Sequence, residues 1–454
     1  MQNKIRSFAI EGLYGKFDVK IPMIDNRIII VGANGLGKST CINAFYYLLS
    51  RQWSRLAELD FERVVIESSL ESVALTKADV ETFTLADEPG RVPHNVLQRA
   101  LHLDPRSLEE FLESGPSEIG RFRELLNYPN SVLREIQSAL RGSLRRNGAL
   151  EKAAEVIREL VSENQILYLP TYRRIEKDLK ALVDREETRR NRIDAEFIRK
   201  LGFRTDVYAE LVEFGMEDVK IRLSETLSAL NDNNRKEFNA LAGSYLRDVI
   251  KGEGQTYSAE EISSLTGEEV TRILRRVEEN TLSWQEKALL TQALDRLRSQ
   301  SPKDSDSYVA HFLTKLVRSA ENLARREKPV TDFVRTCNSY LDGKELVYDE
   351  LSYRVFVRET GTDGREIDLP FLSSGEKQVV SLFAHLYLSE RKYLIVIDEP
   401  ELSLSVTWQK TFLPDIWASG NCTYMAAVTH SPFIFDNDFE KYTFDMKDGM
   451  RRNG

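Results

Sequence analysis

The sequence predicts an α/β fold in which a mixed sheet carries a phosphate-binding loop, the amino-terminal part is rich in strands, and an all-helical segment is inserted in the middle. Three observations lead to this prediction. A glycine-rich loop follows an apolar run within residues 28–40. The chain becomes highly charged, with helical periodicity, over residues 176–328. Two more buried strands follow residue 390, so a nucleotide-binding lobe is expected to be built from both ends of the chain.

The amino-terminal part begins with strand-like segments. Two or three strands are expected between Lys4 and Val31, from "KIRSFAIEG", "KFDVKIP" and "RIIIV". Apolar and polar residues alternate within residues 61–85, and many of them are β-branched, which predicts a hairpin on the same lobe. Residues 95–163 are expected to be helical with short breaks, and their arginines to form a solvated helix face. A strand then ends at Pro170.

The segment "IIIVGANGLGKST", residues 28–40, fits the pattern G-x-x-x-x-G-K-[ST] from Gly32 to Ser39. The apolar run before it predicts a strand, and "STCINAFYYLLSR" after it predicts a helix, which is the context this motif requires. Backbone N–H groups of such a loop surround a β-phosphate, Lys38 would reach the β- and γ-phosphates, and Ser39 would bind Mg²⁺. The residues expected to contact the nucleotide are Asn34, Gly35, Gly37, Lys38, Ser39 and Thr40.

The middle of the chain reads as a helical insertion. Apolar residues recur at three- and four-residue steps, and they predict one helix through Val219, Leu223, Leu227 and Leu230 and a second through Phe238, Leu241, Tyr245 and Val249. Sustained heptads are lacking, and two arms of ~45 residues would reach only about 65 Å. The expected domains are an amino-terminal head part at 1–175, the insertion at 176–328 and a carboxy-terminal head part at 329–454.

The last part of the chain returns to strands. "ELVYD", "LSYRVFVRE" and "REIDLPF" are expected strands, with "GTDG" as a hairpin turn between the last two. "RKYLIVIDEPELSLS" and "CTYMAAVTHSPFIFD" contain two buried strands separated by a helix.

Composition narrows the classes of protein to consider. At 454 residues the chain can form a large core, and no apolar run is long enough to cross a membrane. The amino end lacks the order of a secretory signal, so the protein is expected to be cytoplasmic and not to act at a membrane. The net charge of −9 weighs against coating nucleic acid, although a local basic groove stays open. The scattered Cys41, Cys337 and Cys422 predict reduced thiols with neither a disulfide frame nor a zinc site.

Two carboxylates follow the strand "YLIVI". Asp398 and Glu399 are expected at its carboxyl end, where ligands of parallel sheets lie. Asp398 suits Mg²⁺ through its water shell, and Glu399 suits polarising the water that attacks a γ-phosphate. His430 follows the next strand, from which its imidazole could reach the same phosphate.

A second anion site is predicted by "LSSGEKQ" at 372–378, where small residues open a helix. One lobe already has a phosphate loop, so this site is redundant unless it serves another molecule.

Four segments of the chain resemble those of ABC-type ATPases, closest to the SMC/OLD-like branch. In chain order they resemble the Walker A, signature, Walker B with D-loop, and H-loop segments, and they comprise Gly32–Ser39, 372–378, 395–405 and 429–431. The resemblance implies an ABC-type ATPase head with ATP and Mg²⁺ bound between two heads. It also implies that Ser373, Gly375 and Glu376 meet the nucleotide of the other copy. Ser403 would lie in the D-loop, Glu399 and His430 would be catalytic, and His430 would sense the γ-phosphate.

The sequence departs from the family pattern at two places. Ser374 replaces a glycine common in the signature, and Ser405 stands where many OLD-like relatives have histidine. The sequence does not identify the residue of the Q-loop, another segment of the family pattern. Gln165 is one candidate, and Arg173 and Arg174 could face phosphate or the helical insertion.

Within this branch the sequence resembles ATPases of bacterial antiphage systems, most closely that of the PARIS system, with the Septu and retron ATPase as a close competitor. The resemblance implies a slow ATPase that assembles with itself as a sensor and scaffold. It would hold a separate nuclease of TOPRIM or HNH type until a phage-encoded trigger protein binds. An SMC-like DNA-repair ATPase remains the alternative, and whether nucleic acid is contacted stays open.

Overall fold

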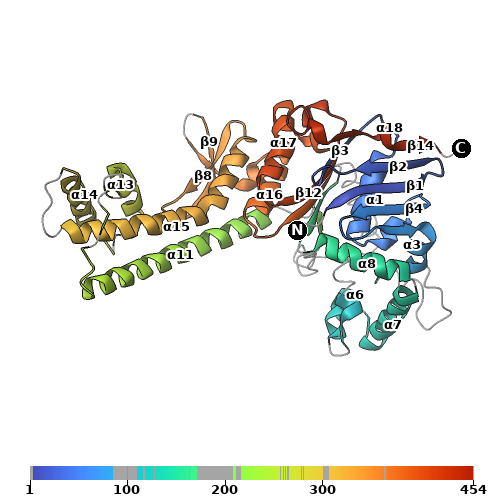
Figure 1. Cartoon of the computed structure of the whole chain (residues 1–454), viewed down its shortest axis with the longest axis horizontal. Helices are drawn as coiled ribbons and strands as arrows, with labels where there is room; N and C mark the ends of the chain where they lie inside the picture. The colour runs from blue at the N-terminus through green and yellow to red at the C-terminus, as the bar shows by residue number, and fades with distance from the viewer. Residues whose placement is uncertain are drawn as a thin grey trace. The chain divides into compact units, whose positions relative to one another are not determined.

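The structure is a computed structural model of the chain. It describes residues 4–84, 100, 110–115, 118–126, 128–146, 148–162, 164–170, 208–210, 216–255, 257–258, 260, 262, 265–277, 279, 281–299, 306–361 and 364–452. The chain forms two compact units. We call residues 1–214 with 390–454 the P-loop unit, and residues 215–389 the arm unit (Figure 1).

The P-loop unit contains a six-stranded parallel sheet in the order β13-β3-β12-β11-β6-β7. Its strands are almost continuously apolar, as expected where both faces of a parallel sheet are covered. Their bounds are β3 (Arg27–Val31), β6 (Gln165–Leu169), β7 (Tyr208–Glu210), β11 (Tyr393–Asp398), β12 (Cys422–Val428) and β13 (Thr443–Asp445).

A second sheet of this unit is antiparallel and five-stranded, in the order β14-β2-β1-β4-β5. It comprises β1 (Ile5–Leu13), β2 (Phe17–Pro22), β4 (Arg63–Ser68), β5 (Val73–Thr76) and β14 (Met450–Arg452). Met450 of β14 pairs with Val19 of β2, so strands from the two ends of the chain share one sheet. The predicted hairpin is only partly correct, because residues 77–84 form a helix instead of extending the second strand.

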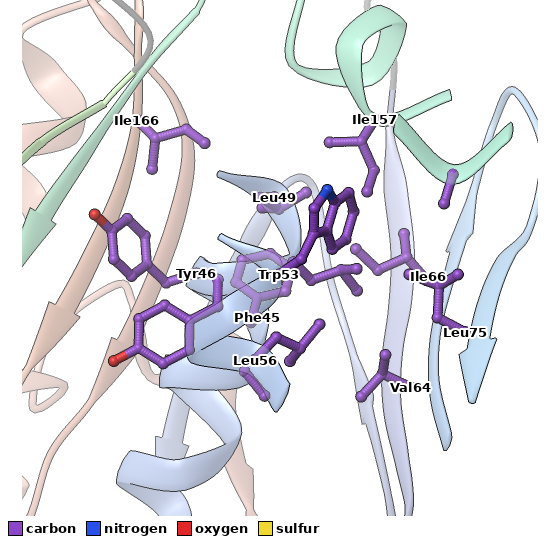
Figure 2. Packing of buried hydrophobic residues seen from close by; sticks show 14 of the residues in the cluster. Phe45, Tyr46, Leu49, Trp53, Leu56, Val64, Ile66, Leu75, Ile157 and Ile166 are labelled. Carbon is purple, nitrogen blue, oxygen red and sulfur yellow. The ribbon is translucent and has the colours of Figure 1, made fainter. Parts of the chain in front are cut away.

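Helix α1 (Lys38–Leu49) packs within the core that joins the two sheets. Figure 2 shows Phe45 and Leu49 of this helix near residues of β4 and β5, with Tyr46 on the side of Ile166. Tyr46 stacks on Tyr168 of β6 with ring centroids 4.2 Å apart. Burial of these rings fixes the helix that begins at the phosphate loop.

The remaining helices of the P-loop unit lie between and after these strands. They are α2 (Trp53–Ala57), α3 (Lys77–Thr84), η1 (Ile119–Phe122), α6 (Arg123–Leu126), α7 (Asn130–Arg146), α8 (Gly148–Val161), η4 (Pro400–Ser403), α17 (Val406–Ala418), η5 (Pro432–Ile434), η6 (Glu440–Tyr442) and α18 (Met446–Gly449).

The arm unit is built on two long helices, α11 (Met216–Ile250) and α15 (Asp306–Asn338), which run side by side (Figure 1). At 35 and 33 residues they span roughly 50 Å, less than the predicted reach. The prediction of two helices within residues 219–249 is wrong, because α11 continues through 231–234 without a break. The four polar residues there include neither glycine nor proline, so nothing in the backbone forces a turn.

The other elements of the arm unit complete its two ends. They are α13 (Gly267–Arg275), α14 (Trp284–Arg298), β8 (Lys344–Asp349), β9 (Arg354–Glu359), β10 (Glu366–Ile367), η3 (Leu369–Phe371) and α16 (Ser374–Tyr387). β8, β9 and β10 form an antiparallel sheet, as predicted, but the third strand is short because residues 369–371 turn into a 3₁₀ helix.

The predicted fold class is confirmed, since a mixed α/β head with a phosphate loop is combined with a largely helical segment. All three cysteines are buried and unpaired. Burial raises the pKa of the Cys41 thiol to about 12, which fits a packing role. Among the described residues, no helix combines the length and apolarity needed to cross a bilayer.

We predict that Asp232→Pro destabilises the arm unit by about 3 kcal/mol, because a proline inside α11 removes a hydrogen bond and clashes with the preceding turn. Asp232→Ala is the matched control, and it should preserve or slightly raise stability, since this exposed site lies inside a helix. Urea unfolding followed by circular dichroism measures both. Equal midpoints for the two variants would mean that a break, not a continuous helix, occupies this position.

Candidate functional site

The loop between β3 and α1 depends on glycines in the left-handed region. Gly35 has φ +81° and Gly37 has φ +90°, which other residues rarely adopt. A Cβ on Gly37 would also come within 3.1 Å of Leu13 and 3.2 Å of Tyr14. Only glycine therefore lets the backbone turn here and begin α1 at Lys38.

Lys38 is buried within this loop, with 4% of its surface exposed. Its ammonium donates to the carbonyl oxygens of Gly32 and Ala33, each at 2.8 Å. Burial lowers the pKa of Lys38, and the charges of Glu399 and Asp398 only partly offset this. A desolvated cation inside a loop whose helix N-terminus is itself positive is suited to receive a polyphosphate.

Ser39 and Asp398 lie together although 359 residues separate them. The Ser39 hydroxyl donates to Asp398 Oδ1 at 3.2 Å, and Asp398 is the last residue of β11. No cluster of three or more His, Cys, Asp or Glu residues that could hold a metal occurs among the described residues. One hydroxyl and one carboxylate fit Mg²⁺, which binds few protein oxygens and completes its shell with phosphate and water. When bound, Mg²⁺ would neutralise charge on the phosphates.

Glu399 follows with an unusual backbone, at φ 55° and ψ 60°. Its N–H donates to the carbonyl of Val428 at 2.9 Å, so the end of β12 stabilises this left-handed turn. His430 Nε2 lies 3.7 Å from Glu399 Oε1. A strained residue held between two strand ends is typical of functional sites, and here it fixes where the carboxylate leaves the sheet.

These segments line one pocket of about 690 Å³, a size suited to a nucleotide. Its lining residues are Tyr14, Asn34, Gly35, Gly37, Lys38, Ser39, Thr40, Glu399, Glu401, Leu402, His430 and Ser431. Sequence reasoning missed Tyr14, Glu401, Leu402 and Ser431. The Tyr14 hydroxyl hydrogen-bonds the Thr40 hydroxyl at 2.6 Å, and only its position in the turn between β1 and β2 could have marked it.

The segment predicted to be the signature, residues 372–378, opens α16 in the arm unit. Ser373 is its N-cap and forms a capping box with Glu376, whose Oε2 accepts from the Ser373 N–H at 2.6 Å. Glu376 is buried, and Lys344 donates to it at 2.8 Å. Burial alone would raise the pKa of Glu376, but the bonds from Lys344 and Ser373 outweigh it and lower that pKa. The carboxylate thus caps its own helix, whereas Ser373 and Ser374 are exposed.

The structure does not bring every predicted residue to the pocket. The structure corrects the expectation that Gln165 could lie at the pocket. Gln165 pairs with Tyr393 at the amino end of β11, which is the end opposite to Asp398 because the strands are parallel. Arg173 and Arg174 lie outside the described residues. Ser403 is in η4, and its side chain is likewise not described. Ser405 caps α17 by accepting from the N–H of Trp408.

The family described as "AAA ATPase domain" matches residues 4–435. Among solved structures, the chain is similar to the Smc head domain with an extended coiled coil bound to the C-terminal domain of ScpA from Pyrococcus furiosus. The identity is 12%, covering 100% of this chain and 97% of that one, with a TM-score of 0.34. It is also similar to the Smc head domain with a coiled coil and joint from Pyrococcus yayanosii, at 14% identity, 100% and 97% coverage and a TM-score of 0.32. No curated protein matches the chain.

We predict that binding of a non-hydrolysable triphosphate analogue weakens as pH rises above the lowered pKa of Lys38. Burial holds this pKa below 10.5 in the free chain, and the phosphate charges raise it in the complex, so binding takes up a proton between the two values. The affinity should fall by up to about tenfold per pH unit in that interval. Titration calorimetry at successive pH values measures this slope.

Lys38→Arg is the matched variant for this titration, because a guanidinium stays charged throughout the range. It should show no such slope, whatever its absolute affinity. A wild-type slope identical to that of Lys38→Arg would contradict the assignment of the titrating group.

Proposed function

The chain belongs to the AAA ATPase domain family, and from that premise we propose that it binds and hydrolyses ATP with Mg²⁺ and uses the nucleotide to join copies of itself. The observation that carries the proposal is one pocket lined by Lys38, Ser39, Glu399 and His430, with Asp398 hydrogen-bonded to Ser39. Each position matches a step of phosphoryl transfer: binding the phosphates, holding the metal, and activating water.

Glu399 is the proposed general base. It accepts a proton from the water that attacks the γ-phosphorus, while the bond between this phosphorus and the β-phosphate oxygen breaks to give ADP and phosphate. Lys38 stabilises the negative charge on the leaving oxygen, and His430 donates to a γ-phosphate oxygen. Because His430 lies 3.7 Å from Glu399, base and γ-phosphate ligand can act on the same phosphoryl group.

The second half of the site comes from another copy. The exposed N-terminal turn of α16 presents small residues, Ser373, Ser374 and Gly375, and the positive end of a helix dipole. Lys344 neutralises the buried Glu376, which keeps this end attractive to an anion. The phosphate loop already serves the nucleotide of its own copy, so the α16 end is proposed to bind the γ-phosphate held by a partner. ATP then acts as an assembly ligand, and hydrolysis releases the partner.

At the level of the cell we propose a sensor and scaffold subunit of an antiphage defence complex. The support is the motif resemblance to the PARIS ATPase and the pairing, in one unit, of the α16 end with long helices that offer surface to other proteins. The complex would hold a separate TOPRIM nuclease and release it when a phage-encoded trigger protein binds. An HNH nuclease in its place would indicate the Septu or retron type.

Shared binding of ATP predicts complementation between two inactive variants. Lys38→Ala removes the phosphate ligand of one copy, and Ser373→Arg blocks the α16 end, so each alone should lose at least about 90% of the hydrolysis rate. In an equal mixture, a mixed dimer keeps one intact site, and the rate should return to as much as about a quarter of wild type. Steady-state phosphate release measures this.

Glu399→Gln and Glu440→Gln calibrate the same assay. The first should bind ATP, hydrolyse it hardly at all and accumulate as the joined form in size-exclusion chromatography. The second changes an exposed glutamate outside the pocket and should behave as wild type. No recovery in the mixture, with both single variants folded, would exclude the shared site.

The defence proposal predicts that Lys38→Ala and Glu399→Gln abolish protection against phage in plaque assays, while the purified chain shows no nuclease activity of its own. Co-purification with the product of the neighbouring gene identifies a TOPRIM or HNH partner. ATP hydrolysis that DNA stimulates, together with an affinity for DNA that falls steeply as the salt concentration rises, would instead indicate a DNA-repair ATPase.

A further inference from the structure

A third carboxylate holds the segment that carries His430. Glu401 lies in η4, two residues after Glu399, and lines the same pocket. Its Oε1 accepts from the backbone N–H of His430 at 2.7 Å. Its Oε2 accepts from the hydroxyl of Thr429 at 2.8 Å. Both oxygens of one side chain therefore bind two consecutive residues that follow β12.

Thr429 makes this contact part of a wider junction. It is fully buried, and its N–H donates to the carbonyl of Ile30 in β3 at 3.1 Å. Its hydroxyl also accepts from the N–H of Ser431 at 3.0 Å. Glu401 thus ties the turn after β11 to the turn after β12, which is itself bonded to the strand that leads into the phosphate loop.

The chemistry of these bonds favours a holding role over proton transfer. An ionised carboxylate accepting from a backbone N–H and a hydroxyl forms charge-assisted bonds, which are stronger and more directional than neutral ones. The hydrogen bonds of Glu401 engage each of its oxygens, whereas Glu399 Oε1 lies opposite the imidazole of His430. The position of that imidazole depends on the backbone to which Glu401 is bound.

We propose that Glu401 is a positioning residue that fixes the backbone at His430 and, through it, sets the imidazole against Glu399 and the γ-phosphate. This inference rests on the proposed ATPase function, because it assigns a role within that same site. The bonds that hold Lys38 and Ser39 do not involve Glu401. Loss of its carboxylate should therefore lower the rate of hydrolysis more than the affinity for ATP.

The test compares Glu401→Ala with Glu401→Gln. The alanine variant removes both acceptors, and kcat should fall by about tenfold to a hundredfold, as for a misplaced reacting group. The dissociation constant of a non-hydrolysable analogue should change by less than about threefold. Glutamine keeps one oxygen for the His430 N–H, and its amide can donate to the Thr429 hydroxyl, so it should recover most of the lost rate.

A double-mutant cycle shows whether Glu401 acts through His430. If it does, adding Glu401→Ala to His430→Ala should lower kcat by less than about twofold, although the same change lowers the kcat of the wild type far more. Hydrogen exchange of residues 428–434 gives a readout independent of turnover: it should accelerate in Glu401→Ala and not in Glu401→Gln. Glu440→Ala, at an exposed site outside the pocket, is the matched control and should change none of these quantities.

The outcomes separate this inference from the proposed function. A wild-type chain without ATP hydrolysis, or a fully active Glu399→Gln variant, overturns the ATPase proposal and the inference with it. If the wild type hydrolyses ATP and Glu399→Gln does not, the inference alone fails when Glu401→Gln hydrolyses ATP as slowly as Glu401→Ala. It also fails if Glu401→Ala costs as much in the His430→Ala background as in the wild type, or leaves exchange at 428–434 unchanged.

Discussion

The parallel pairing of β3, β12 and β11 is the constraint on which the rest of the structure depends. Parallel strands end at the same edge of a sheet, so the loop after β3, the turn after β12 and the carboxylates after β11 must meet there. Segments hundreds of residues apart are thereby joined, as the bond from Ser39 to Asp398 shows. The antiparallel sheet secures the arrangement, since it includes strands from both ends of the chain.

Charged side chains are concentrated at this edge of the parallel sheet, and burying them costs free energy in the chain without a ligand. Lys38 is desolvated, and nearby carboxylates offset the penalty only in part, so its pKa is lowered. Glu399 is held in a left-handed conformation by Val428. A bound triphosphate would supply the counter-charge that Lys38 lacks, while Mg²⁺ would separate the acidic side chains from the phosphates. The pocket is thus electrostatically incomplete without its proposed ligand.

The arm unit carries its own ionic network around the buried Glu327, and this network joins its helices to its sheet. Arg276, at the end of α13, donates to Glu327 of α15 at 2.8 Å and also to Glu350, which follows β8. Tyr348 of β8 donates to the same Glu327 at 2.9 Å. Lys344, at the amino end of β8, forms an ion pair with Glu376 of α16. A partner bound to the helices would therefore act on a body that includes the α16 end.

The sequence alone determined the phosphate loop, the paired carboxylates and the strands that precede them, because these depend on local spacing: an apolar run followed by Gly-Lys-Ser or by Asp-Glu. The order of these strands in the sheet was decided by tertiary structure. It could not reveal the unbroken α11, whose polar middle resembles a loop until packing against α15 stabilises it. It offered Gln165 as a Q-loop candidate, but this residue lies at the end of the sheet opposite to Asp398, and the sequence does not say which end of a strand faces the ligand. The bond from Glu401 to His430 was decided only by tertiary structure, which brings two separate turns within hydrogen-bonding distance.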